Sequence, residues 1–190
     1  IKELRKYNPD FVSVTFGAGG TTTEKTLEWT RCIKQDYSLN VMMHLTCVGA
    51  GLSNIDSIMD KLTEMKVDNI LALRGDLPED VPADSVCKDF AYASDLVKYI
   101  KNKGGDKFSI GIAGYPEKHP EARSMAADID SLKRKVDEGA DFIITQLFFD
   151  NFYFYNYLEK VRAAGITIPV IAGIMPIVNI SQAVRFTQMC

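Results

Sequence analysis

The sequence contains few residues of the kinds that hold metals or form disulfides. It has two histidines and four cysteines in 190 residues, and no two cysteines form a C-x-x-C pair. A three-histidine metal site is therefore impossible within these residues, and neither a zinc site nor a disulfide framework is expected. We expect no metal, and we expect reduced, mostly structural thiols at Cys32, Cys47, Cys87 and Cys190.

The chain also lacks an excess of positive charge and any long apolar run. Its formal net charge is -3, and no apolar stretch approaches the roughly 20 residues of a membrane-spanning helix. Residues 1–10 lack the apolar centre of a signal peptide. We therefore expect a cytoplasmic protein that binds small molecules, with no nucleic-acid or membrane partner.

Six short segments rich in β-branched and aromatic residues do recur, at residues 11–16, 41–46, 69–74, 108–113, 142–148 and 169–175. Between them the apolar residues fall at helical spacing. The clearest such stripe consists of Ile55, Ile58, Met59, Leu62 and Met65 behind a capping Ser53. The other helix signals are a short helix end at residues 1–7, a capping box at residues 21–24, and stripes that end at Gly139 and Gly165. This alternation predicts parallel strands joined by crossover helices.

Two architectures fit this alternation, a doubly wound open sheet and a closed barrel. One strand face is predicted to be apolar and to lie under the helices, and it comprises Val12, Val14, Phe16, Met43, Leu45, Leu71, Leu73, Ile110 and Ile112. The other face carries polar residues toward the strand ends, namely Ser13, Thr15, His44, Thr46, Arg74, Asp76 and Gln146. An open sheet covered on both faces would show near-continuous apolar runs, so a (β/α)8 TIM barrel fits better. We predict one incomplete barrel domain over residues 1–190, with six of the eight βα units and without the first and last strands.

Glycine-rich loops at residues 17–20 and 49–51 begin like a dinucleotide-binding fingerprint. Thr22 and Asn54 occupy the third glycine position of that fingerprint, and no P-loop motif occurs. A Rossmann or P-loop nucleotide enzyme is therefore not expected, and flexible βα loops are the simpler interpretation.

Several polar residues near the strand ends are compatible with both a functional and a structural role. Arg74 and Asp76 could act on a ligand or form an internal salt bridge. His44 could be a hydrogen-bonded structural histidine. Gln146, in an otherwise apolar segment, could bind the amide-like edge of a heterocycle or bond to a neighbouring strand.

A dense polar loop follows the fourth predicted strand. Residues 114–122 include two prolines, two glutamates, a tyrosine and a histidine, and loops of this kind usually serve a site. Arg134 and Lys135, on the helix after this loop, could bind a phosphate or lie on a solvated face.

Taken in order, the motifs resemble the catalytic domain of the methylenetetrahydrofolate reductase family. They lie at residues 12–17, 44–47, 72–78, 115–122, 132–137, 145–150 and 173–176. The resemblance runs from about Phe11 to Cys190, and the shared order and spacing make it specific where any single motif would be weak.

The resemblance implies a flavin-dependent oxidoreductase of one-carbon and methionine metabolism. Non-covalent FAD would take a hydride from NADPH or NADH and pass it to 5,10-methylenetetrahydrofolate, which gives 5-methyltetrahydrofolate. The implied FAD contacts are Thr15, His44, Arg74, Gly75, Asp76, Tyr115, His119, Asp128, Arg134 and Lys135. Asp76 would also act in catalysis, and the implied substrate contacts are Gln146, Gln182 and Phe186. A homo-oligomer is also expected.

One departure from the family pattern concerns the general acid. The family carries it as a glutamate on the first barrel strand, in a Phe-Glu-Phe-Phe-Pro-Pro type motif that these residues lack. We expect that glutamate upstream of Ile1, and we expect the 190 residues alone to lack full activity.

Three other functions remain as alternatives. One is another FAD barrel dehydrogenase, such as a proline dehydrogenase-like enzyme, and one is a barrel that binds flavin or folate without catalysis. A Schiff-base aldolase is disfavoured because no predicted strand end presents an inward lysine.

Overall fold

The computed structural model describes residues 1–16, 20–76 and 89–189. A four-residue helix, α1 (Lys2–Arg5), precedes six strands, each followed by a helix. The strands are β1 (Val12–Val14), β2 (Val41–Thr46), β3 (Asn69–Leu73), β4 (Ser109–Gly114), β5 (Phe142–Thr145) and β6 (Val170–Ile171). The helices that follow them are α2 (Gly20–Gln35), α3 (Leu52–Glu64), α5 (Ala93–Gly104), α6 (Met125–Asp137), α7 (Asn151–Ala163) and α8 (Ile180–Met189). A 3-10 turn, η1 (Gly105–Lys107), leads from α5 into β4.

The order of the strands in the sheet is the order in the chain, β1-β2-β3-β4-β5-β6. The pairs β1–β2, β2–β3 and β5–β6 are parallel. A doubly wound sheet would reverse its order at a switch point, whereas right-handed crossovers that all advance in one direction put every helix on one face. The fold class is therefore the (β/α)8 barrel, with six βα units present, as the sequence predicts.

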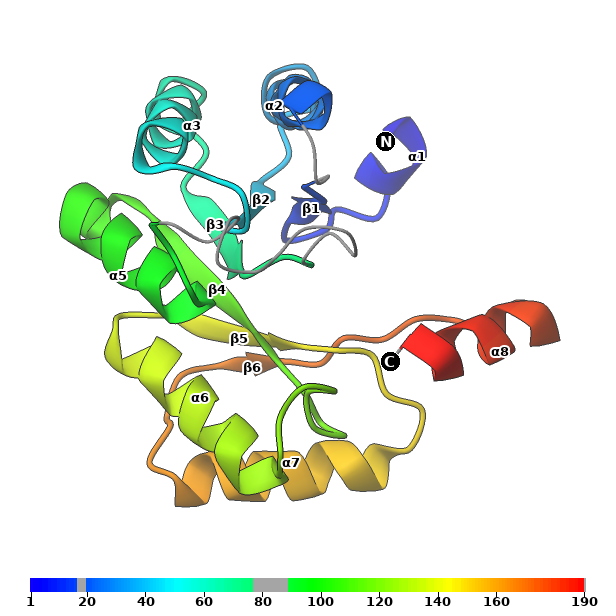
Figure 1. Ribbon diagram of the computed structural model, residues 1–190. Coiled ribbons are helices and arrows are strands. Elements are labelled where there is room, and N and C mark those ends of the chain that lie inside the picture. The colour runs from blue at the N-terminus through cyan, green and yellow to red at the C-terminus, as the bar shows by residue number, and fades with distance from the viewer. Residues whose placement is uncertain (17–19, 77–88, 190) are drawn as a thin grey trace. The chain divides into compact units, whose positions relative to one another are not determined.

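The chain divides into two compact units, Ile1–Gly111 and Ile112–Cys190. In the first unit, α2 and α3 lie side by side over β1–β3 (Figure 1). The predicted stripe of α3 is confirmed, because Ile55, Ile58, Met59 and Leu62 are all buried. A polar link joins α3 to α5, where the Tyr99 hydroxyl donates to Asp56 at 2.5 Å and Lys103 pairs with the same carboxylate at 2.5 Å.

In the second unit, α6 and α7 lie beside each other over β5 and β6 (Figure 1). Its buried residues include Ile129 and Leu132 of α6, Ile143 of β5, and Tyr157 and Val161 of α7. Within the described ranges, no helix is both long enough and apolar enough to cross a bilayer. Neither Cys32 nor Cys47 is in a disulfide, and Cys87 and Cys190 lie outside the described residues.

The predicted strand faces are correct for β1 and β2 but wrong for β3. In the parallel register His44 pairs with Leu71 and Thr46 with Leu73, so these leucines share the face of the polar residues. Ile70 and Ala72 pair with Met43 and Leu45 instead. The error arose because β3 is apolar on both faces, so its alternation carried no information about direction.

Some predicted element ends also shift. Gly51, rather than Ser53, is the N-cap of α3, and α2 begins at Gly20, so that Thr21 lies inside the helix. The fifth and sixth strands are shorter than predicted. β5 ends at Thr145 and β6 has two residues, so Gln146 and Gly173 lie in the loops that follow them.

The helices that lead into strands end in similar turns. Within three residues of the ends of α2, α3, α5, α6 and α7, a residue adopts a positive φ, and these residues are Ser38, Lys66, Gly105, Gly139 and Gly165. The sequence predicts the last two as helix ends. Since each turn precedes a strand, all of them lie at the N-terminal ends of the strands.

Candidate functional site

In the first unit, the predicted contacts lie where β1, β2 and β3 end. Thr15 follows β1, its side chain is exposed, and its carbonyl accepts a hydrogen bond from the Thr26 hydroxyl at 3.2 Å. His44 lies near the end of β2, where burial lowers the pKa of its imidazole below the ordinary 6.5. His44 is therefore neutral near pH 7 and offers one hydrogen-bond donor and one acceptor.

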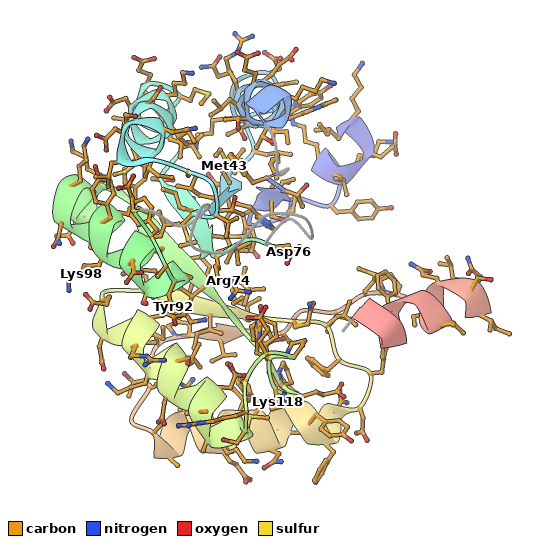
Figure 2. All side chains as sticks on the ribbon, viewed as in Figure 1. Met43, Arg74, Asp76, Tyr92, Lys98 and Lys118 are labelled. Carbon is orange, nitrogen blue, oxygen red and sulfur yellow. The ribbon has the colours of Figure 1, made fainter. Side chains whose placement is uncertain are left out.

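Arg74, Gly75 and Asp76 follow β3 directly, and Figure 2 shows Arg74 and Asp76 where the chain leaves that strand. The Arg74 carbonyl accepts from the backbone N–H of Val48 at 2.8 Å, which keeps this segment against the end of β2. Gly75 has a φ of +86°, and a Cβ at this position would lie 3.0 Å from the Cβ of Thr46. Glycine is therefore required between the arginine and the exposed carboxylate of Asp76.

In the second unit, the loop after β4 is organised around His119. The backbone N–H of His119 donates to the Asp128 carboxylate at 3.0 Å. The imidazole ring of His119 packs edge-to-face with the Tyr115 ring, with 4.6 Å between the ring centroids. Asp128 lies in the first turn of α6, behind the N-cap Ser124. The structure thus brings together three of the predicted cofactor contacts, Tyr115, His119 and Asp128.

Lys135 reaches the same region from farther along α6. Its buried ammonium donates to the carbonyl of Ala113 in β4 at 2.8 Å. Burial lowers its pKa to about 8, although the negative charge of Asp128 opposes the change. Lysine side chains on a helix point toward its N-terminus, which explains how a residue in the last turns reaches the end of β4.

Tyr157 is a buried neighbour of this cluster that the sequence did not indicate. Its hydroxyl is fully enclosed, and among the described residues it has no hydrogen-bond partner. Burial first, and then the charge of Asp128, raise the pKa of this phenol well above its ordinary value. A Cβ on Gly114 would lie 2.0 Å from the hydroxyl oxygen, so the absent side chain at Gly114 is what admits the phenol.

The basic pair of α6 is divided between two environments. Arg134 is exposed, and its guanidinium donates to the Ser131 hydroxyl at 2.8 Å. Lys135 instead points inward, because successive residues on a helix differ by about 100° in direction. The two basic side chains therefore do not lie together on one solvent-exposed face of α6.

The predicted substrate contacts lie in the loop after β5 and on α8. Gln146 is exposed, its backbone N–H donates to the Gly114 carbonyl at 2.7 Å, and its side-chain oxygen accepts from the N–H of Leu147 at 2.9 Å. The Gln182 side-chain oxygen accepts from the N–H of Val178 at 3.1 Å. Phe186 lies one turn after Gln182 on α8 and is half-buried.

A sequence model of one family, described as methylenetetrahydrofolate reductase, matches residues 1–190. The chain belongs to the methylenetetrahydrofolate reductase family. The resemblance carried by the motifs is thereby confirmed, whereas the roles of individual residues stay predictions.

Related proteins of this family come from fungi, plants and bacteria. The chain is 47% identical over 169 residues to methylenetetrahydrofolate reductase 1 of Schizosaccharomyces pombe, which covers 89% of this chain and 28% of that protein. It is 41% identical to methylenetetrahydrofolate reductase (NADH) 1 of Zea mays, covering 97% of this chain and 33% of that protein. It is 40% identical to the 5,10-methylenetetrahydrofolate reductase of Escherichia coli K12, covering all of this chain and 62% of that protein. The chain thus spans about a third of these eukaryotic relatives.

Solved structures support the fold alone. A phosphonopyruvate hydrolase structure aligns with a TM-score of 0.60 at 10% identity, covering 99% of this chain and 75% of that one. A 2,3-dimethylmalate lyase aligns with a TM-score of 0.58 at 11% identity, covering 99% and 74%. At this identity the likeness carries no functional information for the reductase family.

Lys135→Met should stabilise the ligand-free protein of this family at neutral pH. Between about pH 8 and 10.5 the folded state binds fewer protons than the unfolded state, so the free energy of unfolding rises with pH in that window. Below pH 8 the buried charge costs the folded state about 3 kcal/mol. Because the Ala113 carbonyl also loses its donor, we expect a net gain of about 1–2 kcal/mol at pH 7.

Urea unfolding of the flavin-free protein from pH 6 to pH 9 measures this effect. The gain should be constant up to about pH 7 and begin to shrink between pH 8 and 9. Lys133→Met, which removes an exposed lysine paired with Asp137 on the same helix, is the control and should change stability little at any pH. A uniform loss of stability in Lys135→Met would contradict the prediction.

Proposed function

We propose that the intact protein reduces 5,10-methylenetetrahydrofolate to 5-methyltetrahydrofolate, with FAD as its cofactor and NADPH or NADH as the electron donor. The observation that carries this proposal is the family match over residues 1–190. The names of the Escherichia coli and Zea mays relatives support the folate substrate and a nicotinamide donor, respectively.

The residues at the end of β4 fit a large anionic cofactor such as FAD. Among the described residues the buried ammonium of Lys135 has one hydrogen-bond acceptor, the Ala113 carbonyl, so it retains donors for a phosphate oxygen. The enclosed Tyr157 hydroxyl has no partner in the same part of the structure, and buried hydroxyls are normally satisfied by water or ligand. When bound, FAD would supply reversible two-electron chemistry.

We assign the holding of FAD to the residues that the family resemblance implies. They are Thr15, His44, Arg74, Gly75, Asp76, Tyr115, His119, Asp128, Arg134 and Lys135. Neutral His44 would offer a hydrogen bond without a charge, whereas Arg74, Arg134 and Lys135 would supply positive charge for phosphates.

Asp76 is the residue that we assign to the chemistry of the folate. Its carboxylate is exposed at the end of β3, where a ligand can approach it. The methylene carbon of the folate accepts a hydride most readily in the cationic iminium form, and a fixed negative charge nearby stabilises that form. The same carboxylate would contribute little to binding the folate before it forms this cation, because the folate ring is then neutral.

Gln146→Ala should raise the KM for methylenetetrahydrofolate about tenfold while leaving reduction by the nicotinamide donor unchanged. The carboxamide would bind the amide-like edge of the pterin with one donor and one acceptor, and alanine supplies neither. Asn151→Ala, at the exposed first residue of α7, is the control for changes in the same loop region. Unchanged folate kinetics would return Gln146 to a structural role.

An anaerobic titration of the intact protein tests the proposed function. A flavin spectrum that NADPH or NADH bleaches and methylenetetrahydrofolate restores, with formation of methyltetrahydrofolate, would establish the reductase. Bleaching without restoration by the folate would favour another FAD barrel dehydrogenase. A colourless protein that binds no added FAD would overturn the cofactor assignment. The cytoplasmic location and the homo-oligomer remain predictions from the sequence.

A further inference from the structure

Lys118 combines a backbone conformation that is unfavourable for lysine with a side chain that binds its own loop. Its φ is +81°, in the left-handed region that favours glycine. Its ammonium donates to the carbonyls of His119 at 2.8 Å, Pro120 at 3.3 Å and Ala122 at 2.8 Å. An ammonium has three donors, so this loop occupies the whole hydrogen-bonding capacity of Lys118 (labelled in Figure 2).

Further hydrogen bonds within the same loop and to α6 fix the backbone and the ring of His119. The backbone N–H of His119 donates to Asp128, and its carbonyl accepts from the N–H of Ala122 at 3.0 Å. Its ring nitrogen Nδ1 accepts from the backbone N–H of Glu121 at 3.1 Å. A neutral imidazole that accepts at Nδ1 carries its proton on Nε2, so His119 presents Nε2–H as a donor.

We propose that Lys118 is a positioning residue, which folds residues 119–122 around its ammonium and thereby fixes His119 as an Nε2–H donor to the bound ligand. The identity of that ligand as FAD rests on the proposed function. Glu121, whose N–H sets the tautomer, lies between two of the carbonyls that the ammonium binds, so loss of the ammonium should release that N–H. The donor would suit an acceptor oxygen or nitrogen of the cofactor.

The left-handed backbone alone could also shape this loop, and two substitutions separate the explanations. Lys118→Gly removes the ammonium but adopts a positive φ without strain, so the variant should fold at least as readily. Lys118→Met removes the ammonium and keeps a long side chain and the strain. Lys118→Arg keeps the charge and several donors, in a different geometry.

The first measurement is long-range proton–nitrogen NMR on intact, flavin-free protein labelled with 15N-histidine, with His119→Gln used to assign the signal. Wild type should show an unprotonated Nδ1 and a protonated Nε2. Both Lys118→Gly and Lys118→Met should show nitrogen shifts averaged between the two tautomers. Lys118→Arg should retain part of the wild-type pattern, and Lys133→Met should leave it unchanged.

The second measurement is the Kd for FAD of the same variants. Without the ammonium, His119 would no longer be fixed as an Nε2–H donor to FAD. We therefore expect Lys118→Gly and Lys118→Met to weaken FAD binding about tenfold, with partial rescue by Lys118→Arg. An unchanged tautomer in Lys118→Gly, or full FAD affinity in that variant, would overturn the proposal in favour of backbone shape alone. A wild-type protein that binds no FAD would refute the proposed function, while the NMR result would still decide the role of Lys118.

Discussion

Asp76→Asn in the intact protein should leave flavin bound and slow folate reduction about a hundredfold, while flavin reduction by the nicotinamide donor changes little. The substitution keeps the shape of the side chain and one acceptor oxygen, replaces the other oxygen with an NH2 donor, and removes the negative charge. In the proposed role, that charge would act on the cationic iminium of the folate, which forms only in the folate half-reaction, and removing one such electrostatic contact typically costs two to three orders of magnitude. Anaerobic stopped-flow absorbance of the flavin measures the two half-reactions separately.

Asp68→Asn provides the matched control for Asp76→Asn. Asp68 precedes β3 at its opposite end, where its side chain accepts from Asn69 at 2.9 Å, and its substitution makes the same change in net charge. We expect both half-reactions of Asp68→Asn to stay at wild-type rates. Equal slowing of the two half-reactions in Asp76→Asn would refute the assignment of Asp76 to the folate step.

Gly114→Ala should destabilise the protein by about 3 kcal/mol, and Tyr157→Phe should restore part of that loss. The added Cβ would lie 2.0 Å from the Tyr157 hydroxyl oxygen and 2.8 Å from Cγ2 of Ile143. Removing the hydroxyl relieves the first clash and leaves the second. Tyr157→Phe alone should cost less than about 1 kcal/mol in the flavin-free protein, because the deleted oxygen has no described partner.

A double-mutant cycle in urea measures the coupling between the two positions. We expect a coupling energy of about 1.5 kcal/mol or more, in the favourable direction. Gly51→Ala is the control for adding a methyl group without a clash, since its Cβ would lie 3.5 Å from Asp89. Because Gly51 is the N-cap of α3, we expect this variant to lose about 1 kcal/mol or less. Additive effects in the double variant would show that Tyr157 moves aside and that the close approach does not limit stability.

Most of the fold could be predicted because its signals are local. The six strands and the buried stripe of α3 follow from apolar spacing, which reports the direction of a side chain within one element. The faces of β3 could not be predicted, because Ile70, Leu71 and Ala72 are all buried and the pattern does not distinguish two apolar faces. The parallel register with β2 determines which residues of β3 lie on each face. That register depends on residues far away in the sequence.

The candidate site was predictable at the level of motifs and not at the level of contacts. The family resemblance indicated Lys135 and His119 as cofactor contacts, but the lowered pKa of Lys135 depends on burial against β4. In the sequence, Tyr157 is indistinguishable from an ordinary core residue. Its close contact with Gly114 forms only when α7 packs on β4, so the sequence alone does not indicate it. Lys118 gave no signal either, because a positive φ cannot be read from a lysine.

The turns with positive φ have a consequence for how this protein can change over time. Ser38 and Lys66 hold such turns with residues other than glycine, at the ends of the strands opposite to the residues assigned to chemistry. Glycine there would relieve backbone strain without altering any residue that we assign to the cofactor or the substrate. Stability can therefore be tuned at one end of the strands independently of the residues assigned to the ligand at the other end.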